Sequence, residues 1–287
     1  MARDLSLAPL INQQITATQL LEFRNACPQE IADLHLYKIS LLTQTAGILL
    51  RLPQEVIATS IVLLQRYLII AVQSQPDLLS QDTNHEINSP LTIASSAATF
   101  LAAKQSFYPL SPRSIINVYA LLCSPESSPL HFINPDTQSR ASTEPPDPST
   151  YFVSEGVYQT RRDQLFAAEK QILMNLGFDT KVVLPYTLAL TYLQVLGVKD
   201  PELTGRVLAH LNTALLSSQL LYLTHQPNQV AVAAIYLASR ECEVALVDDE
   251  VAWWEVFDVG REELGFLVLS LSSIEGFVRS ITDKGNS

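Results

Sequence analysis

The side chains best able to do chemistry are scattered along the 287-residue chain. The five histidines show no His-Glu-x-x-His spacing, and no Cys-x-x-Cys pair accompanies them, so the common zinc patterns are missing. The sequence also lacks a glycine-rich phosphate loop, a Gly-x-Ser-x-Gly nucleophile elbow and the protein-kinase signature set. We therefore expect no catalytic residues, no metal site and no cofactor, and a protein that is not an enzyme but works by binding.

The charge and cysteine content narrow the class of partner. A duplex-DNA binder needs a basic face to replace phosphate counterions, so the net charge of -11 argues against direct DNA contact. The three cysteines, Cys27, Cys123 and Cys242, are odd in number and far apart. We expect buried thiols of a reducing compartment and no disulfide frame.

Neither a secretory signal nor a membrane span is expected. The N-terminal MARDLSLAPL lacks a cationic start followed by an apolar run. Apolar stretches are interrupted by Gln, Arg or Ser within about 12 residues, short of the roughly 20 that cross a bilayer. These features predict a soluble intracellular protein with no membrane partner.

The elements that position any binding residues are helices. Only 9 glycines occur and hydrophobic residues make up 47% of the chain, with Leu and Ala dominant, which favours an all-α fold with a large core. Apolar residues recur at helical spacing from about Leu34 onward. Ser111 is a candidate N-cap with Pro112 at the first helical position, and Gly177 a candidate left-handed C-cap. The expected helices are 34–51, 53–72, 91–105, 112–122, 157–176, 182–196, 202–223, 228–241 and 262–281, with a short tryptophan-containing piece near 250–257.

Two sets of about five helices flank residue 180, which suggests an internal duplication. SAATFLAAK (96–104) aligns with VAAIYLASR (232–240), with Ala and Leu at identical positions. Small residues let neighbouring helices approach closely, as a central helix requires. The alternative is a chance match between two alanine-rich helices.

We expect three parts: an N-terminal extension (1–33), a first domain (34–180) and a second domain (181–287). The first domain carries an insertion, 124–150, which is rich in Pro and Ser and has no apolar period, so a mobile surface loop is expected there.

Two tandem five-helix repeats, each with an alanine-rich third helix, resemble the paired cyclin boxes of the cyclin family. The resemblance covers roughly 34–281 and is most similar to cyclin L in the transcriptional branch, with cyclins Q and K as rivals. The first box is matched by AGILLRLPQEVIATSIVLLQRYL (46–68), SSAATFLAAKQ (95–105), SPRSIINVYALL (111–122) and RRDQLFAAEKQILMNLGFD (161–179). The second box is matched by TYLQVLGV (191–198), NQVAVAAIYLASRE (228–241) and the Trp-Trp segment AWWEVFDV (252–259).

The resemblance implies a non-catalytic regulatory subunit that binds and activates a cyclin-dependent serine/threonine protein kinase. It implies a role in RNA polymerase II transcription or RNA processing, and a nuclear location with a cytoplasmic pool left open. Transcription or splicing factors are the further partners it implies.

The resemblance also implies the kinase-binding residues. The family signature, a lysine ending the third helix of the box and a glutamate in the fifth, maps to Lys104 and Glu169. Phe107, Tyr108 and Phe166 are the aromatic residues expected at the same interface. Here Gln105-Ser106-Phe107 follows the lysine, where most cyclins place acidic residues. The wider set of groove candidates is Phe100, Phe107, Tyr108, Ile116, Tyr119, Leu165, Phe166 and Ile172.

Each of these residues also has a plainer interpretation. Lys104 near a helix C-terminus gains about 0.3–1 kcal/mol from the helix dipole alone, and Glu169 fits a solvated face. Aromatic residues at helical spacing are usually core, and at least one of Trp253 and Trp254 is expected in the core of the second box.

Two other functions stay open for the whole chain. A scaffold like general transcription factor IIB also uses paired cyclin-like folds, although this acidic chain lacks a cysteine–histidine cluster. The other is an all-helical enzyme with an unrecognised site.

Overall fold

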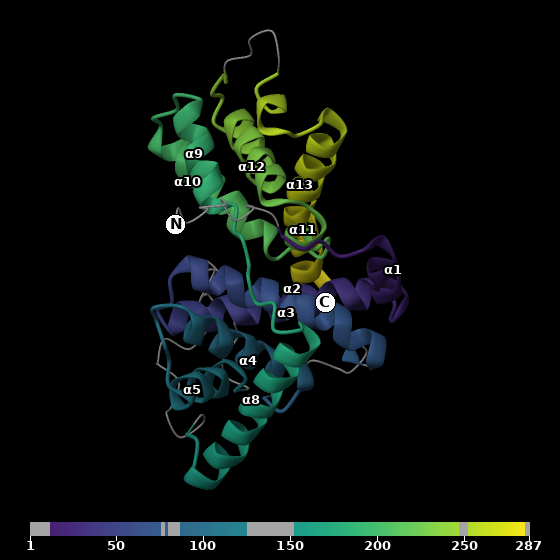
Figure 1. Ribbon diagram of the computed structural model, residues 1–287, viewed down its shortest axis with the longest axis vertical. Coiled ribbons are helices and arrows are strands. Elements are labelled where there is room, and N and C mark those ends of the chain that lie inside the picture. Colours follow the sequence, from purple (N-terminus) through teal and green to yellow (C-terminus); the bar gives the residue numbers. More distant parts are fainter. Residues whose placement is uncertain (1–11, 76–77, 80–86, 125–151, 247–251, 285–287) are drawn as a thin grey trace, which may run out of the picture. The chain divides into compact units, whose positions relative to one another are not determined.

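The computed structural model describes residues 12–75, 78–79, 87–124, 152–246 and 252–284 (Figure 1). These residues form α-helices, short 3-10 stretches and connecting segments, without a strand, which confirms the all-α prediction for the described part of the chain. The predicted surface loop 124–150 lies outside the described residues, apart from Ser124.

The chain divides into two compact units. The first unit comprises Thr16–Thr180 together with Leu215–Ser218, and the second comprises Met1–Ile15, Lys181–Ala214 and Gln219–Ser287. The helices of the first unit are α1 (Ala17–Asn25), α2 (Gln29–Leu49), α3 (Gln54–Ser74), α4 (Pro90–Gln105), α5 (Pro112–Leu122) and α8 (Glu155–Asn175). Those of the second are α9 (Tyr186–Val195), α10 (Pro201–Ala214), α11 (Leu221–Thr224), α12 (Pro227–Glu241), η3 (Glu255–Phe257) and α13 (Arg261–Lys284).

An alanine-rich helix is central in each unit. In the first unit α4 packs against α2, α3, α5 and α8. In the second unit α12 packs against α9, α10, α11, η3 and α13. The buried alanines of both helices give the small surface that close packing on several sides requires. The two segments aligned in the sequence therefore hold equivalent central places in their units.

A buried polar network fixes α4 against its neighbours. Ser95 lies 2.7 Å from the Thr43 hydroxyl on α2 and 2.6 Å from the Tyr119 hydroxyl on α5. Thr99 lies 3.1 Å from the same tyrosine hydroxyl. Burial raises the pKa of Tyr119 to about 12, so its proton stays available for these bonds. Because alanine surfaces specify register poorly, such a satisfied network supplies specificity that packing alone lacks.

Two predicted helix ends are confirmed. The Ser111 hydroxyl caps α5 by accepting a hydrogen bond from the Ser114 N–H at 3.1 Å, with Pro112 at the first helical position. Gly177, just past α8, has φ +57°, in the left-handed region that favours glycine.

Three features of the helices differ from the sequence prediction. Helix α1 was not expected, and α2 begins at Gln29, ahead of the predicted start near Leu34. The predicted helix 202–223 is broken into α10 and α11. The break has a physical cause, because Leu215–Ser218 packs in the first unit. There the Gln65 amide donates to the Leu215 carbonyl at 3.0 Å, and the Arg24 guanidinium donates to the Ser218 carbonyl at 3.1 Å.

Helix α3 is long and apolar enough to cross a membrane, which the sequence analysis did not expect of any segment. Its most apolar window is 83% buried inside the protein, as the core helix of a packed unit requires. Among the described residues, α3 is the one helix with the length and hydropathy to cross a membrane.

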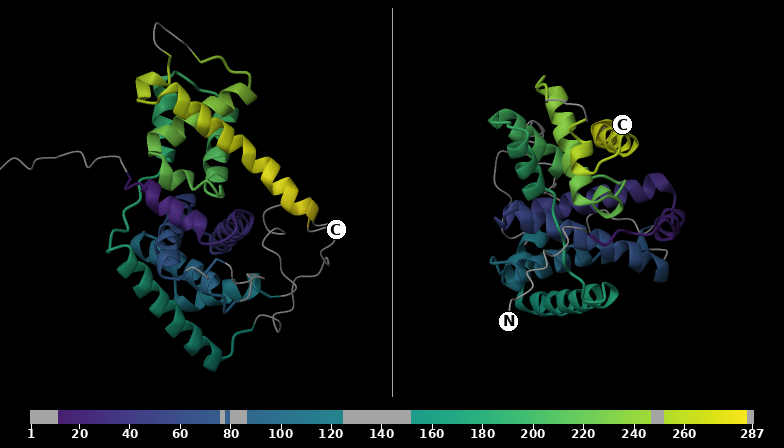
Figure 2. Two further views of the ribbon diagram at one scale, coloured as in Figure 1. Left: turned by 90° about the vertical axis from the view of Figure 1, so that its right-hand side faces the viewer. Right: turned by 45° about the horizontal axis from the view of Figure 1, so that its top comes forward.

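Helix α8, unlike α3, has few buried side chains. Its buried residues are Leu165, Glu169 and Ile172, which form one narrow stripe. Both views in Figure 2 show α8 along the outer side of the first unit, beside α4. Among the described residues, the other side chains of α8 are partly or fully exposed.

Candidate partner-binding surface

Lys104 and Glu169, predicted from the family signature, form a direct ion pair. The Lys104 ammonium lies 2.9 Å from Glu169 Oε1, which joins the last turn of α4 to the middle of α8. The glutamate side chain is 10% exposed and the lysine side chain 58% exposed. The solvated-face interpretation of Glu169 is therefore wrong, because the carboxylate lies in the buried stripe of α8.

Burial makes the two residues unequal in what they can offer a partner. A buried carboxylate needs a charged or hydrogen-bonding partner, and Lys104 supplies one. An ammonium group carries three N–H donors, and the hydrogen bond to Glu169 uses one of them. The pair therefore keeps donor capacity directed at solvent.

Two aromatic rings border the ion pair. The Lys104 ammonium lies 5.4 Å from the centre of the Phe100 ring, one helical turn earlier on α4. Phe100 is buried and packs on Phe166 of α8, with 5.9 Å between the ring centres. Phe166 itself is 41% exposed, so it extends the apolar surface outward from the pair.

Phe107 and Tyr108 lie in the turn that follows α4. Phe107 is 100% exposed and Tyr108 is 54% exposed. Ser106 fixes this turn, since its hydroxyl donates to the Ala103 carbonyl at 2.8 Å and accepts from the Tyr108 N–H at 3.1 Å. The side chain of Gln105, at the place where most cyclins are acidic, donates to the Thr180 hydroxyl at 2.8 Å. A fully exposed phenylalanine on a hydrogen-bonded turn is apolar surface that a partner is able to cover.

Five of the eight groove candidates are core residues instead. Their place in the packed interior follows from the helical period, which sets apolar side chains toward the core of the first unit. The buried candidates are Phe100, Ile116, Tyr119, Leu165 and Ile172. Sequence analysis missed that Phe100 would touch the lysine, although its spacing of one helical turn from Lys104 is the signal for such a contact.

No protein-family model matches the chain. Mouse Cyclin-L2 is 29% identical over 224 residues, which covers 78% of this chain and 37% of that protein. The Caenorhabditis elegans cyclin L homolog cyl-1 is 27% identical over 236 residues, covering 80% of this chain and 44% of that protein. The chain is cyclin L-like.

Solved structures support the fold. A chain of the yeast RNA Pol II CTD kinase CTDK-1 complex matches with a TM-score of 0.62 at 11% identity, covering 91% of this chain and 72% of that chain. A chain of the Chaetomium thermophilum CAK complex bound to ATP-gamma-S matches with a TM-score of 0.53 at 15% identity, covering 86% of this chain and 64% of that chain. The all-α fold of the cyclin L-like chain is that of tandem cyclin boxes. The chain spans less than half the length of the curated relatives named above.

The tryptophan pair of the cyclin L-like chain is part of the packing of the second unit. Trp253 is buried, which confirms the expectation that at least one tryptophan fills this core. Its ring meets Trp254 edge-on at 5.9 Å, and Trp254 meets Tyr236 of α12 at 5.9 Å. These contacts tie the segment before η3 to the central helix.

The cysteines of the cyclin L-like chain are free thiols. Cys27 is buried as predicted, whereas Cys123 and Cys242 are partly exposed, so the prediction of three buried thiols is wrong for these two. Burial still raises the pKa of Cys123 to about 12, which leaves it protonated and unreactive at neutral pH. Within the described ranges, no three His, Cys, Asp or Glu side chains gather where they could hold a metal ion.

Proposed function

We propose that the cyclin L-like chain is the non-catalytic regulatory subunit of a cyclin-dependent serine/threonine protein kinase. The similarity to cyclin L across most of the chain supports this function. The observation that carries it is the Lys104–Glu169 ion pair, formed by the two residues that match the cyclin interface signature, with the half-exposed ring of Phe166 packed on Phe100 beside it. The residues proposed to bind the kinase are Lys104, Phe107, Tyr108, Phe166 and Glu169.

The ion pair is suited to hold a helix of the kinase by its main chain. Lys104 keeps N–H donors for carbonyl groups at a helix end, where the helix dipole also favours a cation. Glu169 holds the ammonium in place, so little side-chain freedom remains to be lost on binding. A cyclin that fixes the regulatory helix of the kinase small lobe allows the Lys–Glu pair over ATP and the metal-binding Asp to align.

The aromatic residues supply the contact area. Buried aromatic anchors contribute most of the binding energy in typical interfaces, while a charged pair at their edge fixes the register. Phe107 has its whole side chain exposed, and Tyr108, the next residue, is 54% exposed. Phe166 adds exposed apolar surface beside the ion pair, where it packs on Phe100. Gln105 and Ser106 stand where most cyclins are acidic, so less negative charge lies beside Phe107, which favours a kinase with an apolar pocket at this point.

The biological setting is also a proposal. Cyclin L-like sequence favours RNA polymerase II transcription or RNA processing, hence a nuclear location and contacts with transcription or splicing factors. We propose residues 34–180 and 181–287 as the first and second cyclin boxes. The net charge of -11 disfavours direct DNA contact, and the burial of α3 disfavours a membrane partner.

The test is affinity purification of the tagged chain, mass spectrometry of the bound proteins and a phosphotransfer assay on a protein substrate. We expect one cyclin-dependent kinase to co-purify, with activity that the chain alone lacks. Recovery of polymerase or DNA without a kinase would support the transcription factor IIB-like alternative. Activity that survives rigorous repurification of the lone chain would contradict the non-catalytic function.

A further inference from the structure

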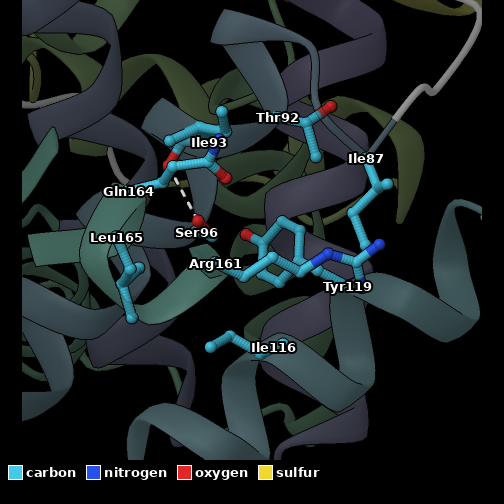
Figure 3. A pocket seen from close by; sticks show the side chains of 9 residues that line it. All are labelled: Ile87, Thr92, Ile93, Ser96, Ile116, Tyr119, Arg161, Gln164 and Leu165. Carbon is cyan, nitrogen blue, oxygen red and sulfur yellow. Dashed lines mark hydrogen bonds between the residues drawn. The ribbon is translucent and has the colours of Figure 1, made fainter. Parts of the chain in front are cut away.

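A small cavity of about 30 Å³ lies within the first unit between α4, α5 and α8. Its volume admits the tip of one side chain and not a nucleotide. Figure 3 shows the nine side chains that line it: Ile87, Thr92, Ile93, Ser96, Ile116, Tyr119, Arg161, Gln164 and Leu165.

Arg161 is the one charged residue among the nine. Its side chain is partly buried, and that burial lowers the pKa of the guanidinium. In the part of the chain that the structure describes, Arg161 makes no hydrogen bond or ion pair. Only a charged Cys123 thiolate would counter this lowering of the Arg161 pKa. Burial raises the pKa of Cys123 to about 12, so the thiol is neutral at pH 7 and supplies no negative charge. A partly buried cation without a counter-charge is unfavourable unless something else supplies the charge.

The neighbouring carboxylates of this helix are already engaged. Asp163 pairs with Arg162 at 3.1 Å, and Glu155 pairs with Arg113 of α5 at 2.6 Å. Neither acidic residue lines the cavity. A negative charge to balance Arg161 therefore has to come from a carboxylate other than Asp163 and Glu155.

The walls indicate what kind of anion fits. Ile93, Ile116 and Leu165 give an apolar floor that suits a short methylene stem. The Ser96 hydroxyl donates to the Ile93 carbonyl at 2.7 Å, whereas Gln164 is exposed at the rim with amide N–H groups to donate. An arginine fork beside an amide donor matches the planar carboxylate of Asp or Glu.

We propose that this cavity receives an aspartate or glutamate side chain of the bound kinase, with Arg161 as its charged anchor. The inference rests on the proposed function. Arg161, Leu165 and Glu169 lie on successive turns of one face of α8, and Ser96 and Lys104 lie two turns apart on α4. Eight helical residues rise about 12 Å, so the cavity and the Lys104–Glu169 ion pair lie about 12 Å apart along the contact between α4 and α8. The acidic residue should therefore lie about 12 Å from the kinase group that meets Lys104.

The test uses full-length variants and the kinase identified by co-purification. Arg161→Gln removes the charge, and Arg161→Met keeps the aliphatic stem. Arg162→Gln is the matched control, because Arg162 is adjacent, pairs with Asp163 and does not line the cavity. We expect both Arg161 variants to raise the Kd for the kinase about 10- to 100-fold, measured by isothermal titration calorimetry. We expect Arg162→Gln to leave the Kd within about twofold.

A double-mutant cycle identifies the partner residue. Neutralising the matching kinase residue, Glu→Gln or Asp→Asn, should weaken wild-type binding by a similar factor and should add nothing to Arg161→Gln. If every acidic residue on the facing kinase surface remains additive with Arg161→Gln, the inference is overturned.

Two further outcomes separate the inference from the proposed function. Normal Kd values for both Arg161 variants, with binding lost when Lys104 and Glu169 are changed, would overturn the cavity assignment alone. Normal binding in all of these variants would overturn the assignment of Lys104 and Glu169 as kinase-binding residues as well, whereas failure of the wild-type chain to bind any kinase would overturn the proposed function itself. The melting temperature should stay near wild type in Arg161→Met, and a fall of several degrees would place the counter-charge in this chain and overturn the inference.

Discussion

At the scale of single residues, Lys104 and Glu169 have a structural role beside the proposed one. The resemblance to cyclins pointed to both residues, but the burial of Glu169 was not predicted. The sequence did contain the signal, because Leu165, Glu169 and Ile172 follow the helical period of one inner face. What the sequence lacked was the partner, since Lys104 lies 65 residues away in the chain.

Charge reversal should therefore affect stability and binding together. We expect Lys104→Glu or Glu169→Lys to lower the free energy of unfolding by about 1–3 kcal/mol, because each places two like charges at a partly buried site. Kinase affinity should fall roughly 30-fold or more. Urea unfolding and titration calorimetry on the same preparations measure both quantities.

The swapped double variant, Lys104→Glu with Glu169→Lys, is the control. It restores the ion pair and hence most of the stability, but it presents reversed charges to the kinase. We expect a melting temperature near wild type and binding still lost. Recovery of binding together with stability would limit the pair to a structural role.

His225 predicts how the stability of the second unit depends on pH. Its ring stacks on Phe266 with 5.4 Å between centres, and burial lowers its pKa from 6.5. The unfolded chain then binds the extra proton first, so the stability that neutral His225 contributes is complete above about pH 6.5 and is lost as the pH falls below it. Melting curves at pH 7.5 and 5.5 should show a smaller loss for His225→Gln than for wild type. An equal loss in both proteins would exclude His225 as the source.

At the scale of helices, patterns that rest on local chemistry were predictable and those that rest on distant contacts were not. The cap at Ser111 and the left-handed Gly177 follow from residue type and position, and the structure confirms both. The apolar pattern runs unbroken past Ala214, so it predicted one helix where two are found. Only the packing of Leu215–Ser218 in the first unit explains that break.

The segment Asn12–Ile15 is the second feature that no local pattern revealed. The Asn12 side chain donates to the Val183 carbonyl at 2.8 Å and accepts from the Val183 N–H at 2.8 Å. The Asn12 main chain forms two further bonds with the Gln226 side chain, at 2.9 and 3.1 Å. These bonds join the N-terminal segment to the start of α12.

We expect Asn12→Ala to lower the free energy of unfolding by about 1–3 kcal/mol, since it leaves both main-chain groups of Val183 without their partner. Gln14→Ala is the control, because Gln14 is exposed and makes one bond to the Thr224 carbonyl at 3.0 Å. Its effect should stay within about 0.5 kcal/mol. Equal effects in urea unfolding would show that the Asn12 bonds add nothing.

At the scale of the whole molecule, the two units do not correspond to two uninterrupted halves of the chain. The first unit takes Leu215–Ser218 from the second half, and the second unit takes the N-terminal segment that contains Asn12. A cut after residue 180, where the sequence suggested a domain boundary, removes one such piece from each unit. The duplication was visible in the sequence, but this exchange of segments was not, because it depends on contacts such as Asn12–Gln226 that span 214 residues.

The isolated second half should therefore be less stable than the same unit in the intact chain. Both tryptophans, Trp253 and Trp254, lie in the second unit, so their fluorescence reports on that unit alone. We expect fragment 181–287 to unfold at a lower urea concentration than the intact chain, because Val183 and Gln226 lose Asn12. The same midpoint in both proteins would contradict a supporting role for the N-terminal segment.

The exchange of segments also sets an order of events during translation. Asn12 leaves the ribosome early, yet Gln226 is made 214 residues later. At roughly 5–20 residues per second, the N-terminal segment waits about 10–40 s for its partner. A nascent chain that stops before Leu215 leaves the buried amide of Gln65 without the Leu215 carbonyl, so neither unit is complete. Premature termination before Gln226 should thus yield a product with unpaired polar groups, open to the proteases that clear unfinished chains.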